Sequence, residues 1–410
     1  MDGTHIIGGY NGLVPTVSFE QGRACVLSEL RERPRTPALE EVELLRGVGR
    51  VLAEPVTADR DFPARPRSVR DGFAVRSVNL PGRLRIVGEV RAGESFGGVV
   101  NAGEAVEIMT GAPMPDGSDS VVMVEHTSVY DGFMQTDHTL RAGENVNPRA
   151  SEAGAGDVLL NAGVRLGYTE MALLATVGRV RVAVFVKPRV AILATGDEIV
   201  GIEETPLPHQ VRNSNSYSLA AQVLLAGGCP EMLPVARDEY SATRDLIERA
   251  LSFDLVLLSG GVSAGKYDIV EKVLADLGAE FYFDRVLIQP GQPLVFGSVG
   301  EKFFFGLPGN PASTMVTFEI FAKPALELLA GQTDPMLPIT WARLGRDFKQ
   351  KTGLTRFLPA RLSADGDEVV PVAWQGSSDV AAMARSNVFL VTEPDREYWA
   401  AGEKIRVLPR

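Results

Sequence analysis

Apolar and polar positions recur with different periods along the chain, and the changes of period divide it into segments. Ser18 and Gln21 have the spacing of a capping box, which predicts a helix that begins at Ser18 and ends before Pro34. Apolar residues recur at helical spacing again in two stretches, 42–52 and 163–177. We expect these two helices to pack together as one small helical body, because the residues between them follow a different pattern.

Short strand-like runs, separated by Gly, Pro and Asp clusters, fill residues 55–149 and are typical of a β-rich domain. From Arg189 onward, apolar strands alternate with helical patterns, which indicates a mainly parallel sheet covered by helices. After Gly331 only strand-like runs remain. The predicted fold is that of a multidomain α/β protein. Residues 17–54 and 150–185 are expected to form a split helical or linker body, and residues 55–149 a β-rich inserted domain. Residues 186–331 are expected to form a central α/β domain, and residues 332–410 a C-terminal β domain.

Composition narrows the classes of protein. A chain of 410 residues that is 45% hydrophobic has apolar material for several domains. Its formal net charge of −11 opposes binding to the phosphate backbone, so we expect no nucleic-acid partner. No apolar run approaches the roughly 20 residues of a membrane span, and the first basic residue is Arg23. We therefore expect a cytoplasmic protein without membrane contact.

Three predicted strands of the central domain, at 190–194, 255–258 and 302–305, each run into an unusual loop. In an open α/β sheet, ligands bind beyond the carboxyl ends of the strands, so these loops are expected to converge on one crevice. The third loop, Pro308-Gly309-Asn310-Pro311, is a rigid turn whose backbone amides and Asn310 side chain are expected to face the same crevice. Helices are expected around these strands at 216–225, 242–251, 269–277 and 313–329.

The loop after the second strand is predicted to cradle an anion. The backbone N–H groups of Gly260 and Gly261 can approach a phosphate closely, Ser259 and Ser263 add hydroxyl donors, and Gly265 lies in the same loop. The spacing matches neither the dinucleotide-binding fingerprint nor the Walker P-loop. Taken singly, each glycine-rich loop has a purely structural role as its alternative.

Asp197, Glu198 and Asp268 place carboxylates beside the proposed phosphates, next to Thr195 and Gly196 of the first loop. They would repel the ligand unless a cation lay between them. Magnesium fits, because it takes few protein carboxylates and completes its shell with phosphate oxygens and water. For Asp268, the cap of the following helix is an equal alternative.

The three loops together resemble those of the molybdopterin molybdenumtransferase family, which comprises the bacterial MoeA proteins and the E domain of gephyrin. Ser68 to Ala74 is similar to the family's Ser-x-x-Asp-Gly-Tyr-Ala segment, and Ile108 to Pro113 is similar to a second hallmark. The likeness continues at Gly143 to Val146 and at Gly376 to Asp379. It covers nearly the whole chain in the expected order.

The resemblance implies insertion of molybdate into adenylylated molybdopterin with release of AMP, in a magnesium-dependent reaction. It also implies a homodimer in which Asp71 and Thr110 of one subunit face the crevice of the other. The expected partners are a molybdopterin adenylyltransferase and apo-molybdoenzymes or their chaperones. The resemblance assigns catalytic roles to Asp71, Thr110, Glu152 and Asp268. It assigns metal ligation to Asp197, Glu198 and Asp268. It assigns ligand contacts to the crevice loops together with Gln289, Gln292, Arg356 and Ser377.

The chain departs from the family pattern at the expected molybdate end. The family's Lys-Pro-Gly-Lys-Pro loop appears as Gln289-Pro290-Gly291-Gln292-Pro293, so two fixed positive charges are missing. Its Gly-Arg-Thr stretch appears as Gly353-Leu354-Thr355, with Arg356 displaced by two positions. Lys266 and Arg285 are candidates to compensate. The alternative function is therefore a paralogue that binds molybdopterin without inserting molybdate, as a carrier or scaffold.

Overall fold

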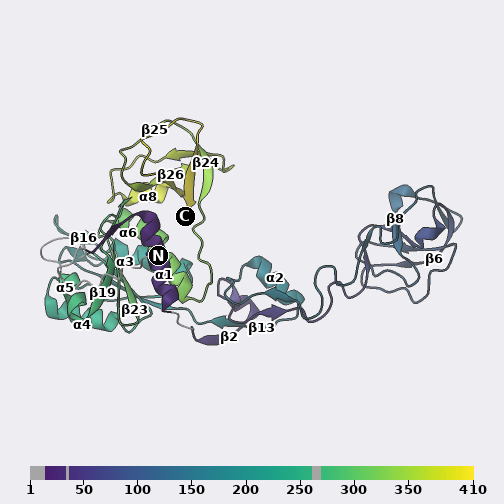
Figure 1. The fold of residues 1–410 in the computed structure, drawn as a ribbon, viewed down its shortest axis with the longest axis horizontal. Helices are drawn as coiled ribbons and strands as arrows, with labels where there is room; N and C mark the ends of the chain where they lie inside the picture. Colours follow the sequence, from purple (N-terminus) through teal and green to yellow (C-terminus); the bar gives the residue numbers. More distant parts are fainter. Residues whose placement is uncertain (1–13, 34–36, 261–268) are drawn as a thin grey trace, which may run out of the picture.

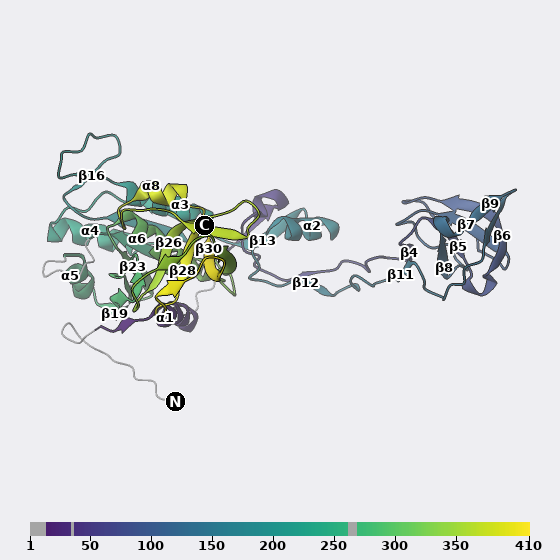
Figure 2. The same ribbon diagram turned by 90° about the horizontal axis from the view of Figure 1, so that it is seen from above.

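The computed structural model describes residues 14–33, 37–260 and 269–410, which form an elongated molecule (Figures 1 and 2). The α/β domain and the C-terminal domain lie together at one end, a small body occupies the middle, and the β-rich inserted domain lies at the opposite end. The multidomain α/β fold class is confirmed. No helix within the described residues is long and apolar enough to cross a membrane.

The α/β domain is built on a six-stranded sheet whose first three strand pairings are parallel and whose last two pairings are antiparallel, so only β22 runs against the other strands. In sheet order the strands are β17 (Cys229–Met232), β14 (Arg189–Ala194), β18 (Leu255–Ser259), β23 (Lys302–Leu307), β22 (Val295–Val299) and β19 (Ala279–Phe283). The three predicted strands, β14, β18 and β23, are direct neighbours.

Helices cover both faces of this sheet (Figure 1). Successive side chains of β14 point to opposite faces and therefore pack in two different hydrophobic cores. Val190 and Ile192 pack with α3, α6 and α7, whereas Ala191 and Leu193 pack with α4 and α5. The predicted helix at 313–329 is interrupted by a π-helical turn, η4 (Phe318–Ala322). The helices of this domain are α3 (Ser214–Leu225), α4 (Tyr240–Ala250), α5 (Ile269–Asp276), α6 (Pro311–Thr317) and α7 (Lys323–Leu329).

The first helix, α1 (Phe19–Glu32), begins with the predicted capping box. The backbone N–H of Gln21 donates to Ser18 Oγ at 3.1 Å, and the backbone N–H of Ser18 donates to Gln21 Oε1 at 2.9 Å. The buried side chains of α1 join the α/β core, where Phe19 packs edge-on against Phe321. This helix therefore stabilises the α/β domain, although it precedes the small body in the chain.

The small body combines a two-stranded sheet, β2 (Leu39–Glu43) with β13 (Arg181–Phe185), the 3-10 turn η1 (Leu44–Gly47) and the helix α2 (Tyr168–Thr176). The predicted helix at 163–177 is present as α2, but the one at 42–52 is wrong. Gly49 has a φ of 75°, which ends any helix there, and Val42 pairs with Val182 of β13. Tertiary strand pairing therefore overrides a local helical pattern.

Two antiparallel ribbons connect the small body to the inserted domain: β3 (Val56–Thr57) with β12 (Val158–Leu160), and β4 (Arg67–Ser68) with β11 (Val146–Asn147). The inserted domain is a six-stranded sheet with a hydrophobic cluster on each face. It is β-rich, as predicted. In sheet order its strands are β8 (Ser120–Met123), β5 (Gly72–Val75), β7 (Glu104–Ile108), β6 (Gly82–Val90), β10 (Phe133–Thr136) and β9 (Ser128–Tyr130).

The C-terminal domain is a six-stranded sheet that closes through the pairing of β26 with β28. Its first strand, β21, leaves the α/β domain between β19 and β22, so the two domains interlock. In sheet order the strands are β21 (Ile288–Gln289), β26 (Thr355–Leu362), β27 (Glu368–Pro371), β24 (Thr340–Leu344), β30 (Lys404–Pro409) and β28 (Val388–Thr392). The short elements are β1 (Thr16–Val17), β15 (Ile199–Val200), β16 (Val211–Arg212), β20 (Arg285–Val286), β25 (Phe348–Lys349), β29 (Tyr398–Trp399), α8 (Val380–Arg385), η2 (Ser77–Asn79) and η3 (Val124–His126).

Candidate functional site

The carboxyl ends of β14, β18 and β23 lie side by side, because Ser259 pairs with Ala194 on one side and with Leu307 on the other. The backbone N–H of Thr195 donates to Ser259 O at 3.0 Å, and that of Gly260 donates to Leu307 O at 3.2 Å. The three strand-end loops therefore begin at one edge of the sheet, as the sequence predicted. We call this region the carboxyl edge.

Gly260 and Gly196 have backbone conformations that favour glycine where these loops approach one another. Gly260 has a φ of 87°, and a Cβ atom there would lie 2.7 Å from the carbonyl oxygen of Thr195. A Cβ atom on Gly309 would lie 3.7 Å from Gly260 Cα, so the backbones of the second and third loops are close neighbours. Gly196, in the first loop, has a φ of 135°. Backbone that carries no side chains can approach a phosphate closely.

The third loop leaves its asparagine available. Asn310 is exposed and occupies the N-cap position of α6, but its side chain makes no capping hydrogen bond. Pro311 starts the helix, and Pro308 is buried at the end of β23. The turn that the sequence predicted is present, and the Asn310 side chain does not cap α6. Its contact with a ligand stays a prediction.

Asn215, which the sequence analysis missed, joins two of the loops. Its Nδ2 group donates to Ser259 Oγ and to Gly309 O, both at 2.8 Å. It lies in the first turn of α3, two residues after the N-cap Asn213. The only sequence signal was the polar run that begins this helix. Thr195 Oγ1, Asn215 Oδ1 and Ser216 Oγ are buried without a hydrogen-bond partner among the described residues.

Two of the predicted metal ligands lie beside a third acid that the sequence analysis also missed. The backbone N–H of Asp238 donates to Asp197 Oδ1 at 3.2 Å. Burial raises the pKa of the Asp238 carboxyl, and the charges of Asp197 and Glu198 raise it further. Within the residues that the structure covers, no group of three His, Cys, Asp or Glu side chains is placed to hold a metal ion. The predicted metal site stays a prediction.

Several predicted contacts lie outside the described residues. They are Gly261, Ser263, Gly265, Lys266 and Asp268, all between Gly260 and Ile269. Their proposed roles stay predictions from the sequence.

Arg356 and Gln289 are paired at the junction with the C-terminal domain. β21 and β26 align the two residues, and Arg356 Nε donates to Gln289 Oε1 at 2.7 Å. Arg356 is 9% exposed, and no carboxylate among the described residues influences its pKa. Its Nη1 donates to the carbonyl oxygens of Lys351 and Leu354. Burial lowers the pKa of this guanidinium, as expected for a cation that lacks a counter-charge.

This junction adjoins the third loop. A Cβ atom on Gly291 would lie 2.4 Å from Thr317 Cγ2, so the turn between Gln289 and Gln292 packs on α6. The backbone N–H of Ala312, also in α6, donates to Ser377 O at 2.9 Å. Gln289, Gln292, Arg356 and Ser377 therefore gather around the helix that follows the third loop. Arg285 lies exposed on β20.

Asp71 and Thr110 form a second polar site, in the inserted domain. The backbone N–H of Thr110 donates to Asp71 Oδ1 at 2.6 Å. This hydrogen bond, followed by one from the Thr110 side chain, lowers the pKa of Asp71. Both residues are exposed. Figure 1 shows the inserted domain at the opposite end of the molecule from the central sheet, so one chain does not bring Asp71 to the carboxyl edge.

Glu152 lies between the two connecting ribbons, after β11 and before β12. It is exposed, and its Oε1 accepts a hydrogen bond from Asn147 Nδ2 at 3.1 Å. It is therefore also apart from the carboxyl edge within one chain (Figure 2).

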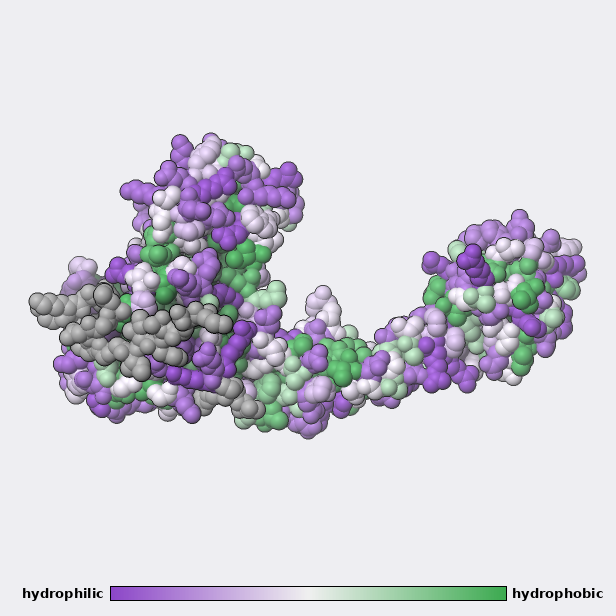
Figure 3. Space-filling view, in the orientation of Figure 1, coloured by the Kyte–Doolittle hydropathy of each residue, from purple (hydrophilic) through white to green (hydrophobic). Residues whose placement is uncertain are grey.

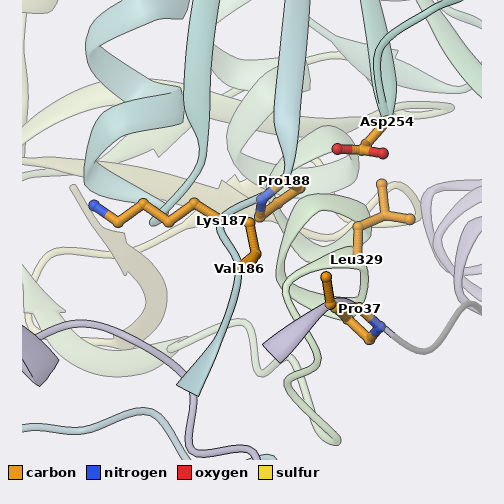
Figure 4. Close-up of a pocket in the computed structure, with 7 residues that line it drawn as sticks. Pro37, Val186, Lys187, Pro188, Asp254 and Leu329 are labelled. Carbon is orange, nitrogen blue, oxygen red and sulfur yellow. The ribbon is translucent and has the colours of Figure 1, made fainter. Parts of the chain in front are cut away.

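A cavity lies at the other edge of the central sheet (Figure 4). Asp254 and Pro188 line it, and these residues precede β18 and β14, so the cavity faces the amino ends of the strands. Asp254 Oδ2 accepts from the backbone N–H of Arg189 at 2.8 Å, and Lys187 extends away from the other lining residues (Figure 4). This cavity lies apart from the predicted ligand loops.

Comparison with known proteins covers almost the whole chain. Residues 17–178 match a family model described as the MoeA N-terminal region (domain I and II). Residues 191–328 match a model described as a probable molybdopterin binding domain. Residues 341–409 match a model described as the MoeA C-terminal region (domain IV). The molybdopterin molybdenumtransferase of Bacillus subtilis (strain 168) is 33% identical over 383 residues, which cover 90% of this chain and 89% of that protein. The chain belongs to the molybdopterin molybdenumtransferase family. It is thereby a transferase of molybdenum cofactor biosynthesis.

Other members of the molybdopterin molybdenumtransferase family agree. The enzyme of that name from Nostoc sp. is 38% identical over 311 residues, with 73% of this chain and 71% of that protein covered. A crystal structure of the molybdopterin biosynthesis MoeA protein from Pyrococcus horikoshii has a TM-score of 0.71 and 31% identity, and covers 96% of this chain and 99% of that chain. The carboxyl edge lies within the part that matches the molybdopterin binding domain.

Proposed function

We propose that this family member inserts molybdate into adenylylated molybdopterin and releases AMP. The observation that carries the proposal is the carboxyl edge, where loops with little side-chain bulk lie beside hydroxyl donors and acids. The anionic part of the ligand binds to the second loop, through Ser259, Gly260, Gly261, Ser263 and Gly265. Thr195, Gly196 and the turn from Pro308 to Pro311 contact its other sides.

The acids beside this loop are proposed to bind a divalent cation together with the ligand, because the described side chains alone form no group of three placed to hold a metal ion. Burial raises the pKa of Asp238, and the charges of Asp197 and Glu198 raise it further, so three acids lie close together. Asp197, Glu198, Asp238 and Asp268 are the proposed ligands of Mg²⁺. When bound, Mg²⁺ offsets the charge of the pyrophosphate. Ser259 and the loop backbone then stabilise negative charge that develops on the phosphoryl oxygens.

We propose a homodimer, in which Asp71 and Thr110 of the partner subunit complete the site and Glu152 lies at its margin. A single chain keeps these residues far from its own carboxyl edge (Figure 1). The small body between the two ends also carries exposed apolar side chains, and Figure 3 shows apolar surface there. Leu45 is 81% exposed, Tyr168 88% and Val180 79%. A second copy that covers them would remove this surface from water.

The molybdate oxyanion is proposed to bind at Arg356 and Ser377, near Gln289 and Gln292. Arg356 offers a buried positive charge, and no carboxylate among the described residues influences its pKa. The alternative function, a paralogue that binds molybdopterin without inserting molybdate, is favoured by one observation. Gln289 and Gln292 are neutral, and Gln289 already accepts a hydrogen bond from Arg356. An oxyanion there would be held by fewer charge-assisted bonds.

The proposed setting is the cytoplasm. A molybdopterin adenylyltransferase would supply the substrate, and apo-molybdoenzymes or their chaperones would receive the product.

Release of AMP from adenylylated molybdopterin, measured with and without Mg²⁺ and molybdate, tests the proposal. We expect release that requires Mg²⁺ and is stimulated by molybdate. Tight binding of the substrate without release would support the non-inserting paralogue. Absence of both binding and release would contradict the proposal and the alternative together.

A further inference from the structure

We infer that Asn215 is a positioning residue of the carboxyl edge, which ties the second loop to the third and orients the Ser259 hydroxyl. The inference deepens the proposed function and rests on it for the identity of the ligand. None of the sequence features used above pointed to this residue.

Both N–H groups of the Asn215 amide are used to span the two loops. One acceptor, Ser259 Oγ, belongs to the last residue of β18, and the other, Gly309 O, belongs to the loop after β23. Both bonds are 2.8 Å long. The two loops also approach each other at Gly260 and Gly309. One side chain from a different element, α3, therefore bridges the two loops, in addition to the backbone hydrogen bond from Gly260 to Leu307 O.

The direction of the bond to Ser259 matters for an anionic ligand. A serine hydroxyl has one hydrogen to donate and two lone pairs that accept. Because Ser259 Oγ accepts from Asn215, its own hydrogen remains available for a phosphate oxygen. The Ser259 carbonyl oxygen already accepts from Thr195, so the backbone of the residue is fixed as well. Asn215 thus presents the hydroxyl as a donor before the ligand arrives.

A purely structural role explains Asn215 poorly. The start of α3 is already capped, since Asn213 Oδ1 accepts from the backbone N–H of Ser216 at 3.1 Å. Asn215 Oδ1 is buried and has no hydrogen-bond partner among the described residues. Leaving a buried acceptor unsatisfied destabilises a fold. The presence of an amide at that position is better explained by the hydrogen bonds from its Nδ2 group to Ser259 and Gly309.

The test compares Asn215→Ala and Asn215→Asp with a matched control, Asn213→Ala, on the same helix. Loss of two hydrogen bonds should raise the KM for adenylylated molybdopterin by about tenfold in Asn215→Ala. Asn215→Asp should be worse, because a carboxylate cannot donate and would face Gly309 O. Asn213→Ala should lower the melting temperature yet change this KM less than about twofold, since it removes only a helix cap. Wild-type KM in Asn215→Ala would overturn the inference.

Hydrogen–deuterium exchange without ligand separates this inference from the proposed function. Peptides that cover 255–260 and 306–312 should exchange faster in Asn215→Ala than in wild type, and remain at the wild-type rate in Asn213→Ala. If the wild-type protein released no AMP, the proposed function would fail, yet this comparison would still decide whether Asn215 ties the loops. Equal exchange in all three proteins would show that it does not.

Discussion

Negative charge gathers at the carboxyl edge, and its effect is clearest at Asp238. Burial, Asp197 and Glu198 all raise the pKa of this carboxyl. A raised carboxyl pKa means that the folded state holds its proton more tightly than the unfolded chain does. Folding stability from this group is therefore present at low pH and is lost as the pH rises through the folded-state pKa. A cation bound among the three acids would reverse that loss.

Asp238→Asn should raise the melting temperature by about 1 °C at pH 7, because it removes one of three crowded charges. The gain should shrink as the pH falls through the folded-state pKa of the wild-type carboxyl, because protonation then removes the same charge from wild type. Added MgCl₂ should raise the melting temperature of wild type more than that of the variant. Asp245→Asn, which changes an exposed acid on α4, is the control. A Mg²⁺ effect of equal size in wild type and Asp238→Asn would remove Asp238 from the metal site.

Arg356, near the helix that follows the third loop, is the side chain that we propose to bind the molybdate oxyanion. Arg356→Met keeps much of the side-chain volume and removes the charge, so it should raise the molybdate concentration for half-maximal cofactor formation by about tenfold or more. The KM for adenylylated molybdopterin should stay within about twofold of wild type. Arg361→Ala, at an exposed position of the same strand, should change neither value. An unchanged molybdate requirement in Arg356→Met would move the oxyanion elsewhere.

Among the elements, the strand-end loops depend on two glycines for different reasons. Gly260 has a positive φ and no room for a Cβ atom, whereas Gly309 has only an ordinary contact at 3.7 Å. Gly260→Ala should therefore destabilise the protein by about 1–3 kcal/mol. Gly309→Ala should keep the melting temperature and raise the KM for adenylylated molybdopterin, because its methyl group enters the space between the loops. Chemical denaturation measures the stability of both variants, and AMP-release kinetics measures their KM. A larger loss of stability in Gly309→Ala than in Gly260→Ala would contradict this geometry.

Elements with strong local signals were predictable from the sequence. The capping box located α1, and the apolar runs located β14, β18 and β23. The helix expected at 42–52 failed because its partner, β13, lies far along the chain. Asn215 and Asp238 were missed for a related reason: each matters through contacts with loops that are distant in sequence. The division of the chain into domains and the roles of the site residues remain proposals.

The shape of the whole molecule separates its two polar sites. Asp71 and Thr110 lie in the inserted domain, and paired ribbons hold that domain away from the central sheet (Figure 2). A fold in which both sites serve one reaction needs residues from two chains, and a symmetric dimer supplies two equal composite sites.

Mixed dimers test this arrangement. Asp71→Ala and Asp197→Asn should each be nearly inactive alone. If each site uses Asp71 from one subunit and Asp197 from the other, a mixed dimer has one site with both changes and one that is intact. Random mixing should then restore about a quarter of wild-type AMP release, since half of the dimers are mixed. Failure to restore activity in verified mixed dimers would place all catalytic groups of a site in one chain.

Reconstitution of an apo-molybdoenzyme with the product made by this protein tests directly whether the protein inserts molybdate. Purified protein, adenylylated molybdopterin, Mg²⁺ and molybdate are incubated together, and the activity of the reconstituted enzyme is assayed. We expect activity that depends on the protein and on molybdate, and that rises in step with AMP release. AMP release without any reconstituted activity would contradict molybdate insertion.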